Sequence, residues 1–373
     1  KRDQNFWPAD MYLEGLDQYR GWFQSSLLTA VGAFGNGAPF KECVTHGWTV
    51  DGEGKAMHKS LGNGVDPADI FNKYGADILR LWAASADYHA DVRCSDAIFK
   101  QLSQNYLKFR NTARYCLGNL DGFDPNNLVA PADMLELDRW AVTRLNALIE
   151  KCAQAYNDYE FLVVTHAVND FCVVELSNFY LDIIKDRLYC DETDGLARRS
   201  AQTALYLILD TITKIMAPIL CFTSQEIWSY IPKLDGMKNY VVFEQMPEAK
   251  AAADEAFEAK WDRIMAIRDD VKKVLEQARA DKTIGSSLEA AVTLYCSDEM
   301  YDFLNAIPMD ELADLFIVSH VDLVEGEGGV KGLVEGLGVS AAHAAGNKCL
   351  RCWKFDTAVG EDGLCPRCAK VLG

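Results

Sequence analysis

The chain has 373 residues, enough for two to four domains at roughly 100–200 residues each. Hydrophobic residues make up 49% of it, which excludes a disordered tail and a disulfide-stapled miniprotein. The 37 Lys+Arg and 55 Asp+Glu give a formal net charge of -18, which argues against nucleic acid as a partner unless the protein has a local basic face.

The first predicted elements are a strand, a turn and a helix. A short apolar stretch over 11–13 ends at Glu14, and apolar residues then recur at helical spacing over 22–30. A second strand is predicted over 43–50, and a Gly-rich loop with lysines follows over 51–64. This order indicates a parallel α/β unit. Because a complete sheet has about four to six strands, the unit is interpreted as half of such a fold.

Helices dominate from Pro67 onward. Amphipathic helices are predicted over 69–84 and 97–117, and the loop over 120–132 is rich in Asn, Asp, Pro and Gly, so we place a domain boundary there. Apolar residues three and four apart then predict a bundle of three or four long helices. Its main stretches are 137–156, 173–188 and 201–222. Pro218 is expected to kink or end the third of them.

The remaining third of the chain predicts a small α+β unit. A charged stretch over 248–260 is a linker or the start of the helix whose apolar stripe runs over 264–278. Strands are expected over 290–295 and 315–324. Residues 326–346 are rich in Gly and Ala and are predicted to form a flexible linker.

Four cysteines near the end of the chain form the strongest local motif. Cys349-x-x-Cys352 and Cys365-x-x-Cys368 are separated by twelve residues. Two such knuckles supply four thiolates in the tetrahedral arrangement that a structural Zn²⁺ prefers, without an open position for catalysis. A pair of disulfides or a redox dithiol is the alternative. The knuckles carry a basic and aromatic rim that is available to contact RNA, formed by Arg351, Trp353, Lys354 and Arg367.

The other eight cysteines are scattered along the chain, most of them in apolar helical surroundings, so we expect free buried thiols. They are Cys43, Cys94, Cys116, Cys152, Cys172, Cys190, Cys221 and Cys296. No signal peptide opens the chain, and no stretch is apolar enough to span a bilayer. We therefore expect a soluble protein of the reducing cytoplasm, with no membrane partner.

Two further motifs are weak when each is taken alone. Glycines flank the lysines of the loop over 54–63, and lysines with a hydroxyl can hold phosphate oxygens, although a solvated surface loop has the same composition. Carboxylates and an amide crowd the stretch over 14–18, just before a helix, which suits ribose hydroxyls and an ammonium group. The alternative there is a simple helix cap by Asp17.

Together these stretches resemble the bacterial isoleucyl-tRNA synthetase family of class I, in its C-terminal portion. The resemblance covers essentially the whole chain, and its motifs occur in the family's order. They are the runs YLEGLDQYRGWF (12–23), THGWTVD (45–51), the lysine loop, GADILRLW (75–82), FYLDIIKDR (179–187), ARADK (278–282) and the terminal knuckles. The run RGWF (20–23) speaks for isoleucine over valyl or leucyl relatives.

The resemblance implies a role for each matching residue. Isoleucyl-adenylate would contact Glu14, Gly15, Asp17 and Gln18, and the nucleotide would lie near His46 and Gly47. Lys59 would be the second lysine of the KMSKS signature, followed by Ser60, and would bind the phosphates of ATP, which the complete enzyme uses with Mg²⁺. The catalysis implied is electrostatic, from a cation on a mobile loop. The four knuckle cysteines would hold Zn²⁺.

The chain departs from the family pattern in three ways. Ala56 and His58 replace the first lysine and first serine of KMSKS, although Lys55 lies one position earlier. None of the six histidines forms the His-x-Gly-His signature of class I synthetases. The editing domain between the two signatures is missing too. We therefore expect a fragment that is catalytically inactive by itself.

The resemblance implies a mainly α architecture. We expect the C-terminal half of a class I Rossmann-like nucleotide fold (1–64), a helical connector or stem-contact region (65–130), an anticodon-binding helical bundle (131–258), a small α+β unit (259–330), and a linker with a zinc module (331–373). The expected partner is isoleucine tRNA, bound by a monomer. Its candidate contacts are Lys185, Arg187, Arg198, Arg199, Arg351 and Trp353.

Two alternatives remain beside this interpretation. One is a free-standing tRNA-binding module descended from a synthetase, which should have lost the adenylate motif as useless. The other is a valyl- or leucyl-tRNA synthetase fragment, against which the run over 20–23 speaks. A plain acidic helical scaffold would explain the composition, but not the zinc knuckles and the adenylate motif together.

Overall fold

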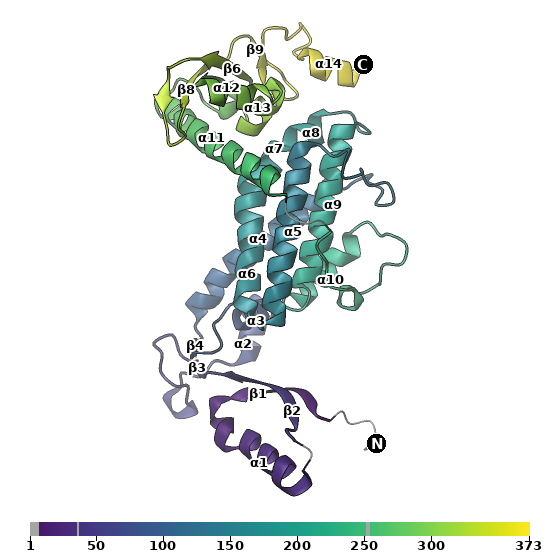
Figure 1. Cartoon of the computed structure of the whole chain (residues 1–373), viewed down its shortest axis with the longest axis vertical. Coiled ribbons are helices and arrows are strands. Elements are labelled where there is room, and N and C mark those ends of the chain that lie inside the picture. The colour runs from purple at the N-terminus through teal and green to yellow at the C-terminus, as the bar shows by residue number, and fades with distance from the viewer. Residues whose placement is uncertain (1–6, 36, 251–253) are drawn as a thin grey trace.

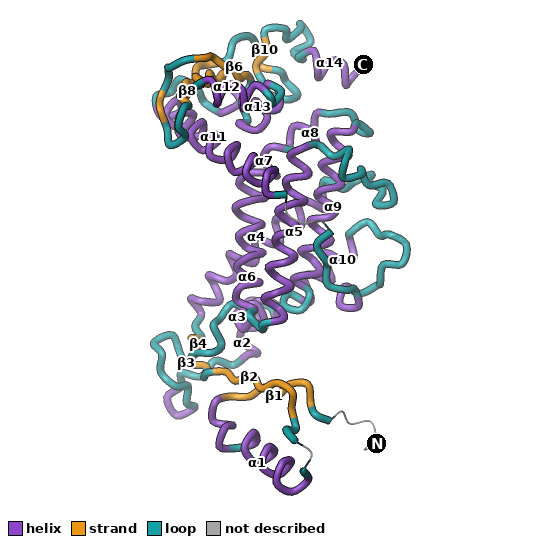
Figure 2. The backbone as a smooth tube through the Cα atoms, viewed as in Figure 1, coloured by secondary structure: helices purple, strands orange, loops and turns teal. Residues whose placement is uncertain are grey.

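The structure is a computed structural model that describes residues 7–35, 37–250 and 254–373, without the side chain of Lys59. Figure 1 shows an elongated molecule, with a small strand–helix unit at one end, a helical bundle in the middle, and an α+β unit with the C-terminus at the other end. Among the residues described, no helix has the length and apolar character needed to cross a membrane. Helices make up most of the backbone, as Figure 2 shows, so the prediction of a mainly α chain is confirmed.

The N-terminal unit has the predicted strand–helix–strand order. Strand β1 (Ala9–Gly15) pairs in parallel with β2 (Phe40–His46), so that Glu14 lies opposite Thr45 and Gly15 opposite His46. The helical part of the connection between them covers one face of the pair. It consists of the short helix η2 (Leu16–Arg20), α1 (Trp22–Thr29) and the π-helical turn η3 (Ala30–Phe34).

Before the connector, β3 (Thr49–Val50) pairs in parallel with β4 (Val92–Arg93), which lies within the connector. The helix predicted over 69–84 is two helices, α2 (Pro67–Tyr74) and α3 (Ala76–Ala84), because Gly75 between them has φ 89°. The side chain of Asp66 caps α2, and Pro67 occupies its first position. The next helix, α4 (Asp96–Gly118), agrees with its prediction.

Helix α3 is fastened to the bundle by two charged side chains. The carboxylate of Asp77 accepts hydrogen bonds from the backbone N–H groups of Phe222 (3.3 Å) and Thr223 (2.7 Å), at the start of α10 (Cys221–Tyr230). The guanidinium of Arg80 donates to the carbonyls of Pro218 (2.6 Å) and Ile219 (2.9 Å). Because Asp77 is buried, these contacts hold the connector rigidly against the turn that follows Pro218.

The bundle places its apolar faces in one core that includes residues of α4. Helix α9 ends at Met216, two residues before Pro218, as predicted. The stretch predicted as one helix over 173–188 is instead a π-helix followed by two short helices, and this change of pitch alters which side chains face the core. The elements are α5 (Glu136–Asn157), α6 (Phe161–Asp170), η5 (Phe171–Tyr180), α7 (Leu181–Ile183), α8 (Lys185–Cys190), α9 (Leu196–Met216), α10 and the turn η6 (Val241–Phe243).

A polar network centred on Asp138 lies inside this bundle. The carboxylate of Asp138 is fully buried and accepts hydrogen bonds from the Tyr180 hydroxyl (2.7 Å), the Ser200 hydroxyl (2.5 Å) and both terminal nitrogens of Arg187 (2.9 and 3.0 Å). Burial is the first cause that raises the pKa of Tyr180 well above its usual value, so this hydroxyl stays a donor. Every oxygen of the buried carboxylate is therefore satisfied.

The α+β unit is built on a four-stranded sheet in the order β6-β5-β8-β7. Strand β5 (Ala290–Cys296) pairs in parallel with β6 (His320–Glu325) and antiparallel with β8 (Leu337–His343), which also pairs with β7 (Val330–Lys331). The helices are α11 (Glu255–Ala280), α12 (Asp298–Asn305) and α13 (Met309–Phe316), and the turn η7 (Ser287–Glu289) precedes β5. Residues 315–316, expected in a strand, end α13.

The prediction of a flexible linker over 326–346 is wrong, because it overlooked β8. Leu337 and Val339 are buried in the sheet, and Gly338 has no room for a side chain: a Cβ there would lie 1.9 Å from the carbonyl oxygen of Gly328. The small residues of this segment therefore permit close packing. The linker before the zinc module is correspondingly short.

Hydrophobic contacts continue across the expected domain boundaries. One cluster of buried side chains extends from Leu81 in α3 to Val339 in β8, through the bundle and α11. The domain boundaries near 130, 258 and 330 stay predictions. Side chains on the two sides of each boundary belong to one hydrophobic core. The zinc module over the last residues has a smaller cluster of its own, which contains its four cysteines and Cys190.

Candidate functional site

The residues predicted to bind the adenylate gather at the carboxyl ends of β1 and β2. Glu14 and Asp17 are exposed, and Gln18 is half-buried. A Cβ at Gly15 would lie 2.9 Å from Oδ1 of Asp17 and 3.7 Å from Cε1 of His46, so both side chains flank this glycine. Ligands of parallel α/β folds bind at such strand ends.

Gln18, and not Asp17, caps the following helix. Its side-chain oxygen accepts a hydrogen bond from the backbone N–H of Trp22 (2.9 Å), and its amide nitrogen donates to Asp17 (3.0 Å). Asp17 itself makes no backbone cap at the start of α1. The Asp17 carboxylate therefore keeps lone pairs that are available to a ligand.

His46 and Gly47 form the corresponding corner of β2. The backbone of Gly47 approaches the neighbouring chain so closely that a Cβ would lie 2.3 Å from the carbonyl oxygen of Ala90, which gives this glycine a structural reason in addition to its predicted role. His46 lines a mostly apolar cavity of about 600 Å³ between the strand pair and the bundle, together with Leu13, Arg80 and residues of the α5–α6 turn. This volume lies within the range of ligand pockets, about 300–1,000 Å³.

The lysine loop has ordered ends and an exposed middle. The carboxylate of Asp51 accepts hydrogen bonds from the N–H groups of Glu53 (3.0 Å) and Lys55 (2.9 Å) and from the side-chain amide of Asn63 (2.8 Å). The bond from Asn63 is the first cause of a lowered pKa for Asp51. Asn63 also accepts from the N–H of His58 (2.9 Å), so one amide closes the loop.

Of the two loop residues predicted to be catalytic, Ser60 is exposed and lies in the short helix η4 (Lys59–Leu61). The backbone of Lys59 belongs to the same turn, but its side chain lies outside the described residues. Lys55 pairs with Glu53 (2.7 Å) on the surface.

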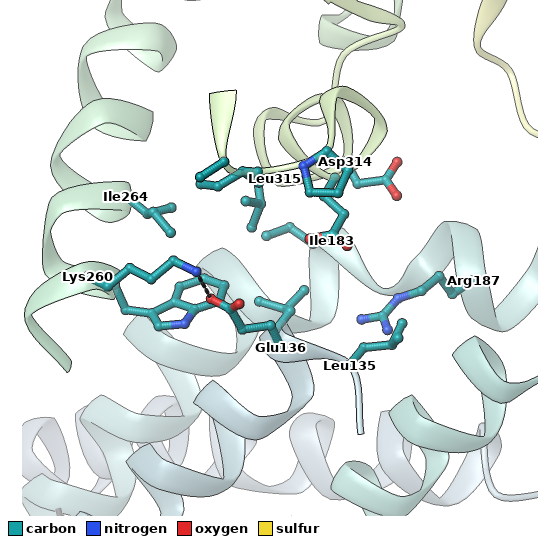
Figure 3. Close-up of a pocket in the computed structure, with 14 residues that line it drawn as sticks. Leu135, Glu136, Ile183, Arg187, Lys260, Ile264, Asp314 and Leu315 are labelled. Atoms are coloured by element: carbon teal, nitrogen blue, oxygen red, sulfur yellow. Dashed lines mark ion pairs between the residues drawn. The ribbon is translucent and has the colours of Figure 1, made fainter. Parts of the chain in front are cut away.

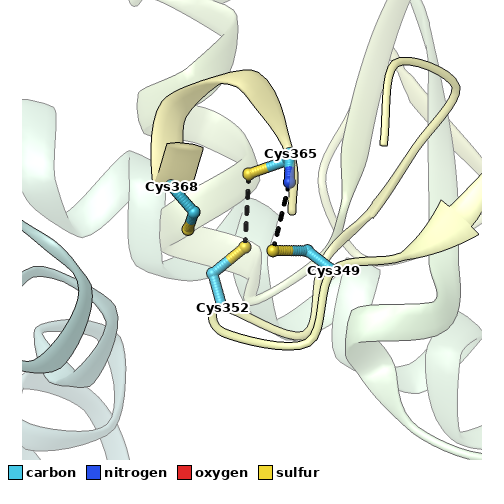
Figure 4. Close-up of side chains that lie close together, drawn as sticks. All are labelled: Cys349, Cys352, Cys365 and Cys368. Carbon is cyan, nitrogen blue, oxygen red and sulfur yellow. Dashed lines mark hydrogen bonds between the residues drawn. The ribbon is translucent and has the colours of Figure 1, made fainter. Parts of the chain in front are cut away.

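The four knuckle cysteines converge on one point, as Figure 4 shows. Their sulfur atoms all lie within 4.8 Å of one another, and the side chains are buried. Sγ of Cys352 lies 3.8 Å from Sγ of Cys365. At a Zn–S distance of about 2.3 Å, tetrahedral geometry separates sulfur atoms by about 3.8 Å. All twelve cysteines lie in the described part of the chain and are free thiols, so the disulfide alternative is wrong for this structure.

The electrostatics favour a thiolate at Cys349, whereas burial raises the pKa of Cys352 and of Cys368. Burial raises the pKa of Cys349, but backbone N–H groups that include those of Cys352, Cys365 and Arg351 outweigh it and bring this pKa to about 6. The N–H of Cys365 donates to Sγ of Cys349 at 3.3 Å. Four buried sulfur atoms with this spacing and such donors fit a structural Zn²⁺, which would hold the two knuckles together.

Three of the four rim residues make polar contacts within the fold. Arg351 donates to the carbonyl of Cys190 (2.7 Å), Lys354 pairs with Asp314 (2.5 Å), and Arg367 pairs with Asp186. Trp353 differs, because 59% of its surface is exposed and it has φ 64°. Contact of this rim with RNA stays a prediction, with Trp353 its most accessible side chain and the two arginines and the lysine already paired within the fold.

The candidate tRNA contacts on the bundle are mostly engaged within the fold. Arg187 is 8% exposed and holds Asp138, so its assignment as an RNA contact is wrong. Lys185 pairs with Asp182 (2.6 Å) and Arg199 pairs with Asp194 (2.5 Å), in each case at the surface. The sequence analysis missed Asp138, whose carboxylate is the partner that a buried Arg187 requires.

A small cavity of about 100 Å³ lies where the bundle meets the α+β unit (Figure 3). Its walls include Ile183, Ile264 and Leu315, and an ion pair between Lys260 and Glu136 (2.7 Å) lies at its edge. This volume is well below the about 300 Å³ of the smallest common ligand pockets. We therefore assign it no ligand.

Comparison with known proteins identifies the relatives of the chain. Three family models match the chain: tRNA synthetases class I (I, L, M and V) at residues 1–95, the anticodon-binding domain of tRNA ligase at 138–294, and the zinc finger found in FPG and IleRS at 346–371. The isoleucine–tRNA ligase of Geobacter sulfurreducens is 51% identical over 376 residues, which cover 98% of this chain and 40% of the relative. Over nearly its whole length, the chain matches the C-terminal portion of isoleucine–tRNA ligases.

Other relatives agree with this assignment. The isoleucine–tRNA ligases of Desulfitobacterium hafniense (48% identical) and Moorella thermoacetica (49% identical) match 100% of this chain and 41% of their own length. The chain thus spans about 40% of the curated relatives it matches, and corresponds to their C-terminal portion. A LeuRS solved in a ternary complex with tRNA and LeuAMS, from Agrobacterium radiobacter K84, is 19% identical with a TM-score of 0.52, covers 78% of this chain and 31% of its own, and supports the fold alone.

Proposed function

We propose that this chain supplies the tRNA-binding part of an isoleucine–tRNA ligase, an enzyme that activates isoleucine with ATP and transfers it to isoleucine tRNA. The observation that carries the proposal is the identity of about 50% over nearly the whole chain with curated isoleucine–tRNA ligases. The match of the anticodon-binding model to residues 138–294 supports tRNA as the partner of the bundle.

For the adenylate, we propose contacts from Glu14, Gly15, Asp17 and Gln18, with His46 and Gly47 beside the nucleotide. The support is that these residues occupy the ends of two adjacent parallel strands, with Gly15 opposite His46. The exposed carboxylates suit ribose hydroxyls and an ammonium group, while the glycine backbones permit close approach. Each of these residues would bind and orient the substrates, and none would react with them.

For the phosphates of ATP and their Mg²⁺, we propose Lys59 and Ser60. A lysine on a loop with fixed ends can approach the departing pyrophosphate and stabilise its charge. Asp51 and Asn63 supply those fixed ends. Ala56 removes one cation of the family signature, and the neighbouring Lys55 forms an exposed ion pair with Glu53.

For the metal, we propose that Cys349, Cys352, Cys365 and Cys368 are the four ligands of one structural Zn²⁺. The burial and mutual spacing of their sulfur atoms support this assignment. We also propose that the chain is selective for isoleucine tRNA, is a monomer and is located in the cytoplasm. A free-standing module or a valyl or leucyl enzyme is not favoured, because the relatives described above are isoleucine–tRNA ligases.

Two assays on the same preparation test this function. We expect the chain to retain labelled isoleucine tRNA on a filter and to show no isoleucine-dependent ATP–pyrophosphate exchange, because its sequence contains no His-x-Gly-His signature. Failure to retain the tRNA in low salt would contradict the proposed partner. Measurable exchange would contradict the proposal that this chain binds tRNA without activating isoleucine by itself.

A further inference from the structure

The zinc module, defined here as residues 346–373, is attached to the bundle through an arginine of each knuckle. Arg367 lies between Cys365 and Cys368, and its guanidinium donates to both oxygens of Asp186 in α8, one of them at 2.7 Å. It also lies 3.7 Å from the carboxylate of Asp191. Two acidic partners and a bidentate contact fix the direction of this side chain.

The first knuckle makes a reciprocal contact with the end of α8. Arg351, between Cys349 and Cys352, donates to the carbonyl oxygen of Cys190 (2.7 Å), and the Cys190 thiol contacts the carbonyl of Arg351 (3.6 Å). Cys190 is buried in the same cluster as the four knuckle cysteines. The surface that receives the module is therefore formed by Asp186 and Cys190 of α8 and by Asp191, which follows the helix.

The module also contacts the α+β unit. Lys354 pairs with Asp314 in α13 (2.5 Å), and the N–H of Phe355 donates to the hydroxyl of Ser319 (2.7 Å). The module thus lies between two parts of the fold that are far apart in sequence. Its position beside α8 and α13 is visible at the C-terminal end of Figure 1.

We propose that zinc binding and docking of the zinc module on α8 are one coupled equilibrium, in which Arg351 and Arg367 are positioning residues. Each arginine lies within a Cys-x-x-Cys turn, so its direction depends on the conformation that the turn adopts when both cysteines bind the metal. Four thiolates and one Zn²⁺ carry a formal charge of about −2, and the guanidinium groups of Arg351 and Arg367 lie between this centre and the acidic end of α8. Linkage then requires docking to strengthen zinc binding by the same factor by which zinc strengthens docking.

The coupling extends to the interior of the bundle through α8. Asp186, which receives Arg367, is followed by Arg187, which holds the buried carboxylate of Asp138. Release of the module therefore removes two contacts from a six-residue helix that carries part of this network. We expect α8 to lose protection from hydrogen exchange when zinc is withdrawn, although it contributes no ligand to the metal.

The experiment measures zinc affinity with a competing chelator and amide exchange over 185–190, with and without zinc. The variants are Arg367→Gln and Asp186→Asn, which alter the docking pair from its two sides, and the double variant. Lys370→Gln is the matched control, because Lys370 is an exposed cation on the same helix α14 (Pro366–Leu372) and forms no ion pair within the described residues. Circular dichroism confirms that each variant keeps its helices.

We expect Arg367→Gln and Asp186→Asn each to weaken zinc binding about tenfold, near the lower end of the roughly 5–150-fold typical of coupled sites. The double variant should be no weaker than either single one, and Lys370→Gln should match the parent chain. Unchanged zinc affinity in both single variants, or α8 protection that is indifferent to zinc, would overturn the proposal. Neither readout involves RNA, so these results are independent of the proposed tRNA binding.

Discussion

Asp138 offers the sharpest test of how the bundle is held together. We predict that Asp138→Asn lowers the free energy of unfolding by about 3–5 kcal/mol, the usual cost of breaking a buried ion pair from one side. Asp138 is 0% exposed, and its four hydrogen bonds all come from donors, so the amide group of Asn would place a donor against a donor. Arg187 would also stay buried without a counter-charge.

Urea denaturation followed by circular dichroism measures this loss. The control is Asp182→Asn, which removes a carboxylate that pairs with Lys185 while 44% of its own side chain is exposed. That change should cost only about 0–1 kcal/mol. The joint replacement Asp138→Leu with Arg187→Met should recover only part of the loss, because no buried charge remains but the Tyr180 and Ser200 hydroxyls lose their acceptor. Equal effects of the two single Asn variants would refute the reasoning.

Three further predictions concern the candidate sites. Gly47→Ala should lower the free energy of unfolding by about 1–3 kcal/mol in thermal denaturation, because its Cβ would overlap the carbonyl of Ala90; an unchanged melting temperature would contradict this. Asn63→Ala should speed proteolytic cleavage within 52–62. In the parent chain, cleavage there should also become faster as the pH falls below 3.8. The pKa of Asp51 is lowered in the folded chain, so the contacts of its carboxylate stabilise the loop above pH 3.8 and are lost as the pH falls through the folded-state pKa. Cys368→Ser should reduce bound zinc from one equivalent to a chelator-labile trace, and full retention in metal analysis would rule out the four-ligand site.

Much of the fold could be predicted from local pattern. The α4 and α5 helices, the parallel strand pair and the end of α9 before Pro218 all follow from periodicity and proline chemistry. The break at Gly75 was missed because apolar spacing continues through it. Strand β8 was missed because small residues suggest flexibility, although here they allow close packing against neighbouring backbone.

The candidate sites divide in the same way. The zinc knuckles could be predicted because all four ligands are close in sequence, and the structure brings their sulfur atoms together. The roles of Arg187 and Arg367 could not, because their partners Asp138 and Asp186 lie 49 and 181 residues away. Charge alone suggested contact with RNA, whereas burial assigns Arg187 to the fold and long-range pairing gives Arg367 a partner within it.

The most direct test of the account is the binding of this chain to isoleucine tRNA, beside the same tRNA with an altered anticodon. Both titrations should be made at one moderate salt concentration, because phosphate contacts make affinity depend strongly on salt. We expect tight binding that is lost when the anticodon changes, and that is weakened when a chelator removes zinc. Equal, weak binding to both tRNAs with no effect of the chelator would contradict it.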